Sequence, residues 1–151
     1  MANDPIVTLE RIWHREIPIS AAMGIRIAGL ANDTLEARAA LAPNVNVHGT
    51  AFAGSLYAIA ALTGWGAVWL ALERRGIDGH IVIADGTIQY LRPVAGEIVA
   101  RCRFASAEHA SAWQTLEATG KCRFPLEVAI AGDGEDAARF RGSYAVRLER
   151  R

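Results

Sequence analysis

The stretch APNVNVHGTAFAGSLYAIAALTGWGAVWLAL, residues 42–72, contains no side chain that is charged at neutral pH. From residue 52 to residue 72 it is long enough to be a transmembrane candidate. Three glycines, Ser55 and Thr63 interrupt it, and the segments around it have the pattern of strands. We therefore predict a central helix over about residues 51–75 that is apolar on every side and is covered by protein, not by lipid.

The remaining sequence predicts strands on both sides of this helix. Leu35, Ala37 and Ala39 alternate with Glu36 and Arg38, as expected for a half-buried strand. Strand-like segments lie at 23–41 (two strands joined by a turn), 80–93, 96–104, 122–130 and 137–148. A short amphipathic helix is expected over about residues 5–17, whereas residues 106–120 fit either a helix or a long connection. We predict a single α+β domain over residues 1–151, in which a curved antiparallel sheet surrounds the helix.

Composition excludes several classes of function. The 151 residues carry 16 basic and 16 acidic side chains, so no net charge favours nucleic acid or an anionic membrane. Cys102 and Cys122 have no metal-ligand spacing around them, and the four histidines are scattered, so we expect neither a metal site nor a cofactor. The first residues have no secretory pattern, and we expect a cytoplasmic protein.

The segments NVNVHGTAFAGSL, EIPIS, TGWG and IQYLRPV resemble the thioesterase-like domain at the C-terminus of YiiD-type proteins. The resemblance extends from about residue 9 to residue 148. It implies a hotdog fold, a homodimer with a continuous sheet that could pair into a dimer of dimers, and an active site at the dimer interface. It also implies thioesters of coenzyme A or acyl carrier protein as substrates.

The start of the predicted helix is the candidate oxyanion site. Unpaired backbone N–H groups and the helix dipole favour negative charge at such a position. In hotdog thioesterases the segment is commonly His-Gly-Gly, with the first glycine N–H facing the thioester oxygen. Here it is Phe52-Ala53-Gly54, so the histidine is missing and Ala53 replaces the first glycine. Both Ala53 and Gly54 can still donate a backbone N–H.

A catalytic carboxylate is harder to identify. Many hotdog thioesterases have Asp or Glu on the third helical turn, where this chain has Ala61. Asp85, among isoleucines in a predicted strand, is the nearest candidate base, provided that burial raises its pKa; a structural carboxylate is the alternative. Asn46 could orient water or hold the thioester carbonyl, whereas Asn44 is expected to make an ordinary Asx turn.

We expect further substrate contacts from His48, Thr50, Ser55, Thr63, Tyr90 and Arg92. The leading hypothesis is a hydrolase that acts on acyl-CoA or acyl-carrier-protein thioesters in fatty acid metabolism. The absence of a helix carboxylate favours decarboxylation of malonyl-acyl carrier protein as an alternative, because that reaction needs enolate stabilisation and no general base. The third hypothesis is a non-catalytic module that binds acyl thioesters.

Overall fold

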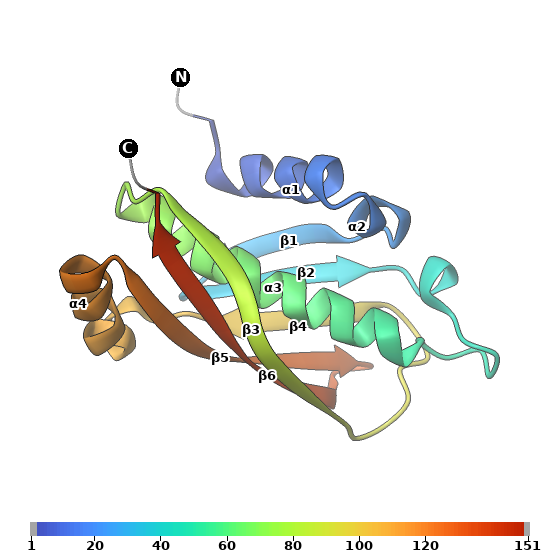
Figure 1. Cartoon of the computed structure of the whole chain (residues 1–151). Coiled ribbons are helices and arrows are strands. Elements are labelled where there is room, and N and C mark those ends of the chain that lie inside the picture. Colours follow the sequence, from blue (N-terminus) through green and yellow to red (C-terminus); the bar gives the residue numbers. More distant parts are fainter. Residues whose placement is uncertain (1–2, 150–151) are drawn as a thin grey trace.

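The computed structural model describes residues 3–149. Its centre is helix α3 (Ala53–Arg74), around which a six-stranded antiparallel sheet curves (Figure 1). The strand order is β1-β2-β4-β5-β6-β3. The strands are β1 (Arg26–Ala31), β2 (Thr34–Ala39), β3 (Gly79–Tyr90), β4 (Ile98–Arg103), β5 (Lys121–Gly132) and β6 (Glu135–Leu148). The predicted α+β class and the central helix are confirmed.

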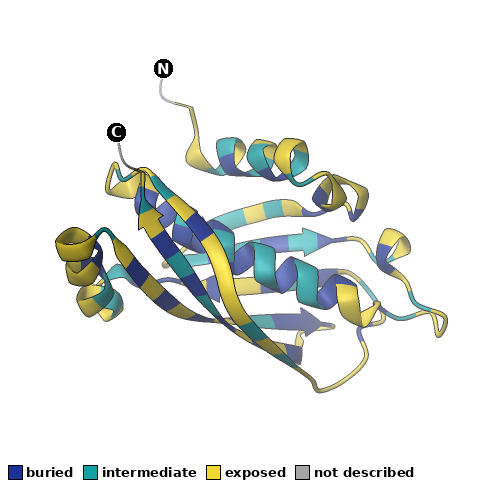
Figure 2. Ribbon diagram, in the orientation of Figure 1, coloured by how far each residue is buried: buried dark blue, intermediate teal, exposed yellow. Residues whose placement is uncertain are grey.

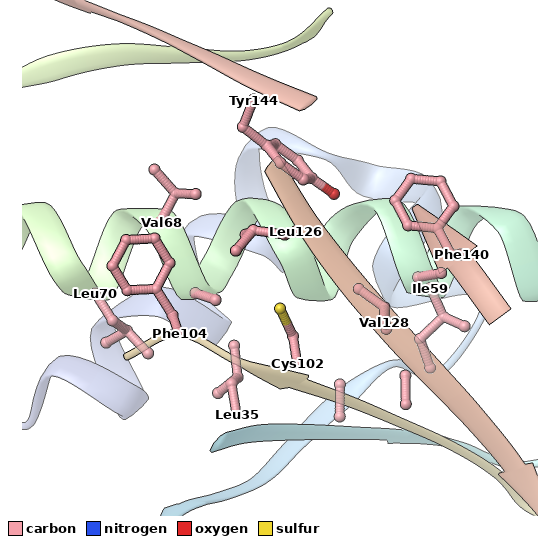
Figure 3. Close-up of a cluster of buried hydrophobic side chains, with 14 of the residues drawn as sticks. Leu35, Ile59, Val68, Leu70, Cys102, Phe104, Leu126, Val128, Phe140 and Tyr144 are labelled. Carbon is pink, nitrogen blue, oxygen red and sulfur yellow. The ribbon is translucent and has the colours of Figure 1, made fainter. Parts of the chain in front are cut away.

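Helix α3 packs closely against its surroundings because two of its glycines have no side chain. A Cβ on Gly66 would lie 2.6 Å from Cζ2 of Trp13, and one on Gly64 would collide with the Tyr144 hydroxyl. That hydroxyl donates a 2.7 Å hydrogen bond to the Ala61 carbonyl. Figure 3 shows Tyr144 with other apolar side chains of the core, which strands on several sides of α3 contribute. The helix is therefore held by both shape and hydrogen bonding.

The N-terminal helix expected over about residues 5–17 is observed as α1 (Pro5–Glu16). A second short helix that was not predicted, α2 (Pro18–Ala22), follows it. Asp4 caps α1 through a 2.9 Å bond from the Ile6 amide. The chain breaks at Ile17 because a residue before proline is driven out of the helical region.

Residues 106–120 are mainly helical. A single 3-10 turn, η2 (Ser106–His109), leads into α4 (Ala110–Thr119), and Gly120 ends α4 in the left-handed conformation. Trp113 packs on Phe124 with a centroid distance of 4.8 Å, and the Arg75 guanidinium lies 4.0 Å above the Trp113 ring. Helix α4 thus covers the core near the C-terminal end of α3.

One edge of the sheet has no neighbouring strand among the described residues. β3 pairs only with β6, and its side chains are largely exposed (Figure 2), including Val82 and Ile83. At the opposite edge, Glu10 of α1 accepts a 2.7 Å hydrogen bond from the Ile27 amide of β1. The two edges are therefore unequal, and β3 is the one left open.

By length and composition α3 could cross a membrane, and it is the one helix among residues 3–149 that could. In its most apolar window 61% of the residues are buried inside the domain. The sheet thus supplies the cover that an apolar helix needs, and nothing here indicates a membrane protein.

Candidate active site

The loop before α3 is shaped by the Asn46 side chain. Its Oδ1 accepts hydrogen bonds from the amides of His48 (2.8 Å) and Thr50 (3.2 Å). Its Nδ2 donates to Thr50 Oγ1 (2.9 Å) and to the Ala51 carbonyl (3.2 Å). One carboxamide therefore closes the turn over residues 46–51 and fixes the chain that enters the helix.

Asn44 anchors the same loop to neighbouring segments of the chain. Only 2% of its surface is exposed, and its Nδ2 donates 2.8 Å bonds to the carbonyls of Met23 and Ala40. Its own carbonyl accepts a 2.7 Å bond from the Phe52 amide. The expectation of an ordinary Asx turn at Asn44 is wrong, because that turn is made by Asn46 and Asn44 is a buried tether. The sequence does not show which of the two asparagines makes the turn.

The first turn of α3 has free donors. Phe52 is extended (φ −62°, ψ 133°), so the helix begins sharply at Ala53, and no side chain caps it. Among the described residues, no acceptor pairs with the amides of Ala53, Gly54 or Ser55, and both Ala53 and Gly54 are exposed. The Phe52 ring lies against Gly54, where an added Cβ would be 2.5 Å from Cε1. The helix start can therefore accept an anionic oxygen beside an aromatic wall.

Tyr90 reaches this helix start from the end of β3. Its hydroxyl donates a 2.9 Å hydrogen bond to the Ala53 carbonyl, and partial burial raises the pKa of the phenol. Arg92 instead forms an ion pair with Glu135, so its guanidinium is already partnered. The predicted substrate contact of Tyr90 thus has a position beside the site, whereas Arg92 would have to leave Glu135 first.

Three other residues with predicted substrate contacts differ in exposure. Thr63 is fully buried and its hydroxyl donates to the Ile59 carbonyl at 2.6 Å, so this hydroxyl is already bonded within the helix. Ser55 is also buried, whereas His48 is exposed at the loop tip. His48 contributes its own amide to Asn46.

Asp85 is not buried within this chain. Its side chain is 70% exposed and its Oδ2 lies 3.9 Å from Nη1 of Arg123. Simple alternation would put Asp85 on the inner face with Ile81 and Ile83, but a β-bulge between Ile83 and Asp85 shifts the register. One extra residue moves a side chain to the opposite face of a sheet. The expected burial is therefore wrong for the single chain, while the role of Asp85 stays a prediction.

A cavity of about 200 Å3 lies between α2, the open side of α3 and β3. Sequence inspection missed it, because segments far apart in the chain form its walls. They are almost entirely apolar: Ile17, Ile19, Ser20, Met23, Ile25, Ala58, Ala61, Leu62, Trp65, Ile83 and Tyr144. Ala61, at the position where the resemblance led us to look for a carboxylate, is thus part of an apolar surface.

The thiols are poor nucleophiles. Cys102 and Cys122 are free and buried, and burial raises their pKa values to about 12 and about 11. A thiol needs a lowered pKa to react near neutral pH. Within residues 3–149, no group of three or more His, Cys, Asp or Glu side chains is placed to hold a metal ion. The chemistry that this site offers is therefore that of amide donors, one carboxamide and an apolar wall.

Fold and site together define a thioesterase-like protein of the hotdog class. Residues 6–148 match the family described as "Putative thioesterase (yiiD_Cterm)", so the chain belongs to this family. A solved structure from Shewanella oneidensis, described as a "putative thioesterase", is 38% identical, with a TM-score of 0.87 over 96% of this chain and 98% of that one.

Two further solved structures agree in fold. A Chlorobaculum tepidum protein of unknown function is 34% identical, with a TM-score of 0.91 over 95% of this chain and 94% of that one. The Haemophilus influenzae thioesterase HI1161 is 18% identical, with a TM-score of 0.75 over 97% of this chain and 93% of that one. At that identity the likeness concerns the fold alone.

Proposed function

We propose that the protein hydrolyses acyl thioesters of coenzyme A or of acyl carrier protein in the cytoplasm. The observation that carries this proposal is the bare first turn of α3, where Ala53 and Gly54 are exposed and their amides have no acceptor among the described residues. Negative charge develops on the carbonyl oxygen when a nucleophile attacks a thioester. One preorganised donor to such an oxygen contributes about 3 kcal/mol of transition-state stabilisation.

Asn46 acts in this scheme as the residue that orients the site. Its side-chain hydrogen bonds hold the loop whose last residues enter the helix. A rigid loop keeps the backbone N–H groups at the helix start in a fixed orientation. Small displacements of such donors lower the reaction rate. Fixing this loop is the contribution of Asn46 that the geometry supports.

We further propose that the chain works as a homodimer in which two β3 strands pair. The supporting observations are the open edge of β3, its exposed Val82 and Ile83, and the half-exposed side of α3 beside it. An exposed strand edge with apolar side chains readily pairs with another strand. Asp85 lies near the middle of β3, the strand that would pair.

Decarboxylation of a malonyl thioester is the second candidate, and Ala61 favours it. The third turn of α3 bears a methyl group in apolar surroundings instead of a carboxylate. Loss of CO2 would leave an enolate oxygen that the helix amides could stabilise, and protonation of the enolate would give the acetyl thioester. This reaction needs no base to activate water.

A product assay separates the candidates. Purified protein is given acyl-CoA and malonyl-carrier-protein substrates, and free thiol, acetyl carrier protein and CO2 are measured. Free thiol supports hydrolysis, whereas acetyl carrier protein without free thiol supports decarboxylation. Saturable binding without turnover on either substrate contradicts both and leaves a binding module.

The Asn46→Ala variant tests the loop. We expect kcat/KM to fall at least tenfold while the protein stays folded, because the freed loop would no longer fix the helix amides. Thr50→Val serves as the matched control, since it removes one hydroxyl of the same network and leaves the Asn46 carboxamide in place. Unchanged kinetics in Asn46→Ala would remove Asn46 from the mechanism.

A further inference from the structure

We infer that the outer face of the sheet carries a binding site for a small organic phosphate, beside the end of α4. Its centre is a row of three basic side chains on neighbouring strands. His80 of β3 pairs with Arg147 of β6, and Arg147 pairs with Lys121 of β5. All three side chains are exposed, whereas the adjacent Cys122 and Val146 point into the core. The row therefore faces solvent.

This row lacks the charge compensation found elsewhere in the sheet. Every other arginine in the six strands forms an ion pair with a carboxylate: Arg26, Arg38, Arg101, Arg103, Arg123, Arg139 and Arg141. Among the described residues, neither Arg147 nor Lys121 has such a partner, although the two lie directly opposite each other. Like charges in directly opposed positions destabilise a sheet. A bound anion would remove this repulsion.

An open groove of about 680 Å3 follows the row between α4 and the sheet. It includes all three basic side chains of the row, and no carboxylate is among the described residues that line it. Val82 and Ala145 give it an apolar floor. Neighbouring strands lie about 4.8 Å apart, so the oxygens of one phosphate group can accept hydrogen bonds from both Lys121 and Arg147. A volume of this size is typical of small-molecule sites, and the floor suits the organic part of the ligand.

The end of α4 explains only part of this charge. Helix α4 ends at Thr119, and the carbonyl groups at the C-terminus of a helix favour a nearby cation such as Lys121. The Thr119 hydroxyl is bonded within this turn and is not free to donate to a ligand. One cation would satisfy the helix end, so Arg147 opposite Lys121 still requires an anion.

The groove is separate from the helix-start site and from the edge of β3, so the inference does not depend on the proposed function. His80 lies near the start of β3, and Tyr90, which bonds to Ala53, lies at its end. Ten residues of extended strand span about 33 Å. Lys121 and Arg147 lie on β5 and β6, inside the β3 edge, so pairing of two β3 strands leaves their outer face uncovered. The phosphate is therefore a second ligand, apart from a thioester carbonyl at the helix start of the same chain.

The test uses pyrophosphate and ADP as probes, with sodium chloride at equal ionic strength as the reference. A ligand at about a hundred times its Kd should raise the Tm by about 5–10 °C, and calorimetric titration gives the Kd. Lys121→Gln and Arg147→Gln should each weaken binding about tenfold, because each removes a hydrogen bond to a charged group. ADP should bind more tightly than pyrophosphate, since its organic part contacts the apolar floor.

Arg141→Gln is the matched control. Arg141 lies on the same face of β6 but pairs with Glu127, outside the groove, so its substitution should leave the Kd unchanged. Without ligand, Lys121→Gln should raise the Tm by about 1–3 °C, because repulsion from Arg147 is removed. Arg141→Gln loses an ion pair and should not raise it. Lys121→Gln thus gains stability without the probes and gains less than the wild type when they are added.

Three results would overturn the inference. The first is that neither probe binds or raises the Tm. The second is that Arg141→Gln weakens binding as much as Lys121→Gln, which would indicate general attraction to the sheet. The third is that an acidic protein, apo acyl carrier protein, binds this face while neither probe does, which would assign the face to a macromolecule. If the probes bind as expected but no thioester is hydrolysed, the proposed function fails and the phosphate site stands.

Discussion

The first turn of α3 and the middle of the same helix are built in opposite ways. At the start, small residues are exposed, the helix has no side-chain cap, and amides stay unpaired among the described residues. In the middle, Gly64 and Gly66 let Tyr144 and Trp13 approach so closely that no Cβ would fit. Small residues thus leave the backbone amides accessible at the start of α3 and permit close packing in its middle.

The start of α3 therefore serves function, whereas its middle serves stability. Without a capping side chain, the helix start lacks about 1 kcal/mol of stabilisation. A ligand that accepts hydrogen bonds from the amides would take the place of the cap. The packed middle supplies the stability that permits this. Substitutions in the two regions should therefore affect different measurements.

The largest expected effect is on activity at the helix start. Ala53→Pro removes one amide N–H, and proline fits here because it is tolerated at the first helical position and Phe52 is already extended. We expect kcat/KM for the preferred thioester to fall about a hundredfold, the value of one oxyanion donor, with the free energy of unfolding nearly unchanged. Steady-state kinetics and urea unfolding measure the two quantities.

The control for this substitution is Ala53→Ser, which keeps the amide and should keep most of the activity. If Ala53→Pro and Ala53→Ser lose activity equally, the amide of Ala53 is not the donor. If Ala53→Pro instead unfolds the protein, the helix start is not separable from the packed region, and the contrast between the two regions is lost.

The second effect concerns stability in the middle of the helix. Gly66→Ala places a methyl group 2.6 Å from Trp13 Cζ2 and 3.1 Å from a Leu9 carbon. Overpacking of this kind costs about 1–3 kcal/mol, against which the better helix propensity of alanine returns up to about 1 kcal/mol. We expect a net loss of about 1–2 kcal/mol in chemical unfolding, with kcat/KM of the folded fraction unchanged. An equal or greater stability would mean that α1 moves aside freely.

Much of the fold follows from local patterns. Leu35, Ala37 and Ala39 are buried in alternation with Glu36 and Arg38, because a strand has a period of two. Helix α3, expected over about residues 51–75, is observed at Ala53–Arg74, because a charge-free segment of that length needs cover on all sides. These elements depend on their own sequence more than on their neighbours.

The site depends on tertiary detail that local patterns do not contain. Which asparagine closes the turn depends on the contact of Asn44 with the Met23 carbonyl, so the turn was assigned to Asn44 when Asn46 makes it. The side to which Asp85 points is decided by the bulge that precedes it. The burial of Thr63 and the bond from its hydroxyl to Ile59 are seen only in the packed helix.

The smallest expected effect is a change in stability from a substitution on the outer face of the sheet. This substitution is a reference for those in the two regions of α3. Glu36 on β2 accepts 2.7 Å hydrogen bonds from Arg38 and from Arg101 on β4. Partial burial raises the pKa of this carboxyl group, but the two arginines outweigh burial and the net pKa is lowered.

A folded pKa below the unfolded value stabilises the protein above about pH 4.5, and this stability is lost as the pH falls through the lowered folded pKa. Glu36→Gln should therefore lower the free energy of unfolding at pH 7 by less than about 1 kcal/mol, since such pairs are weak in solvent. The difference from the wild type should shrink as the pH falls below 4.5. Urea unfolding from pH 7 to pH 3 measures it, with kcat/KM at pH 7 expected to stay constant. A difference that grows on acidification would show that the arginines do not stabilise the ionised carboxylate, and a loss of activity would show that the outer face is coupled to the helix start.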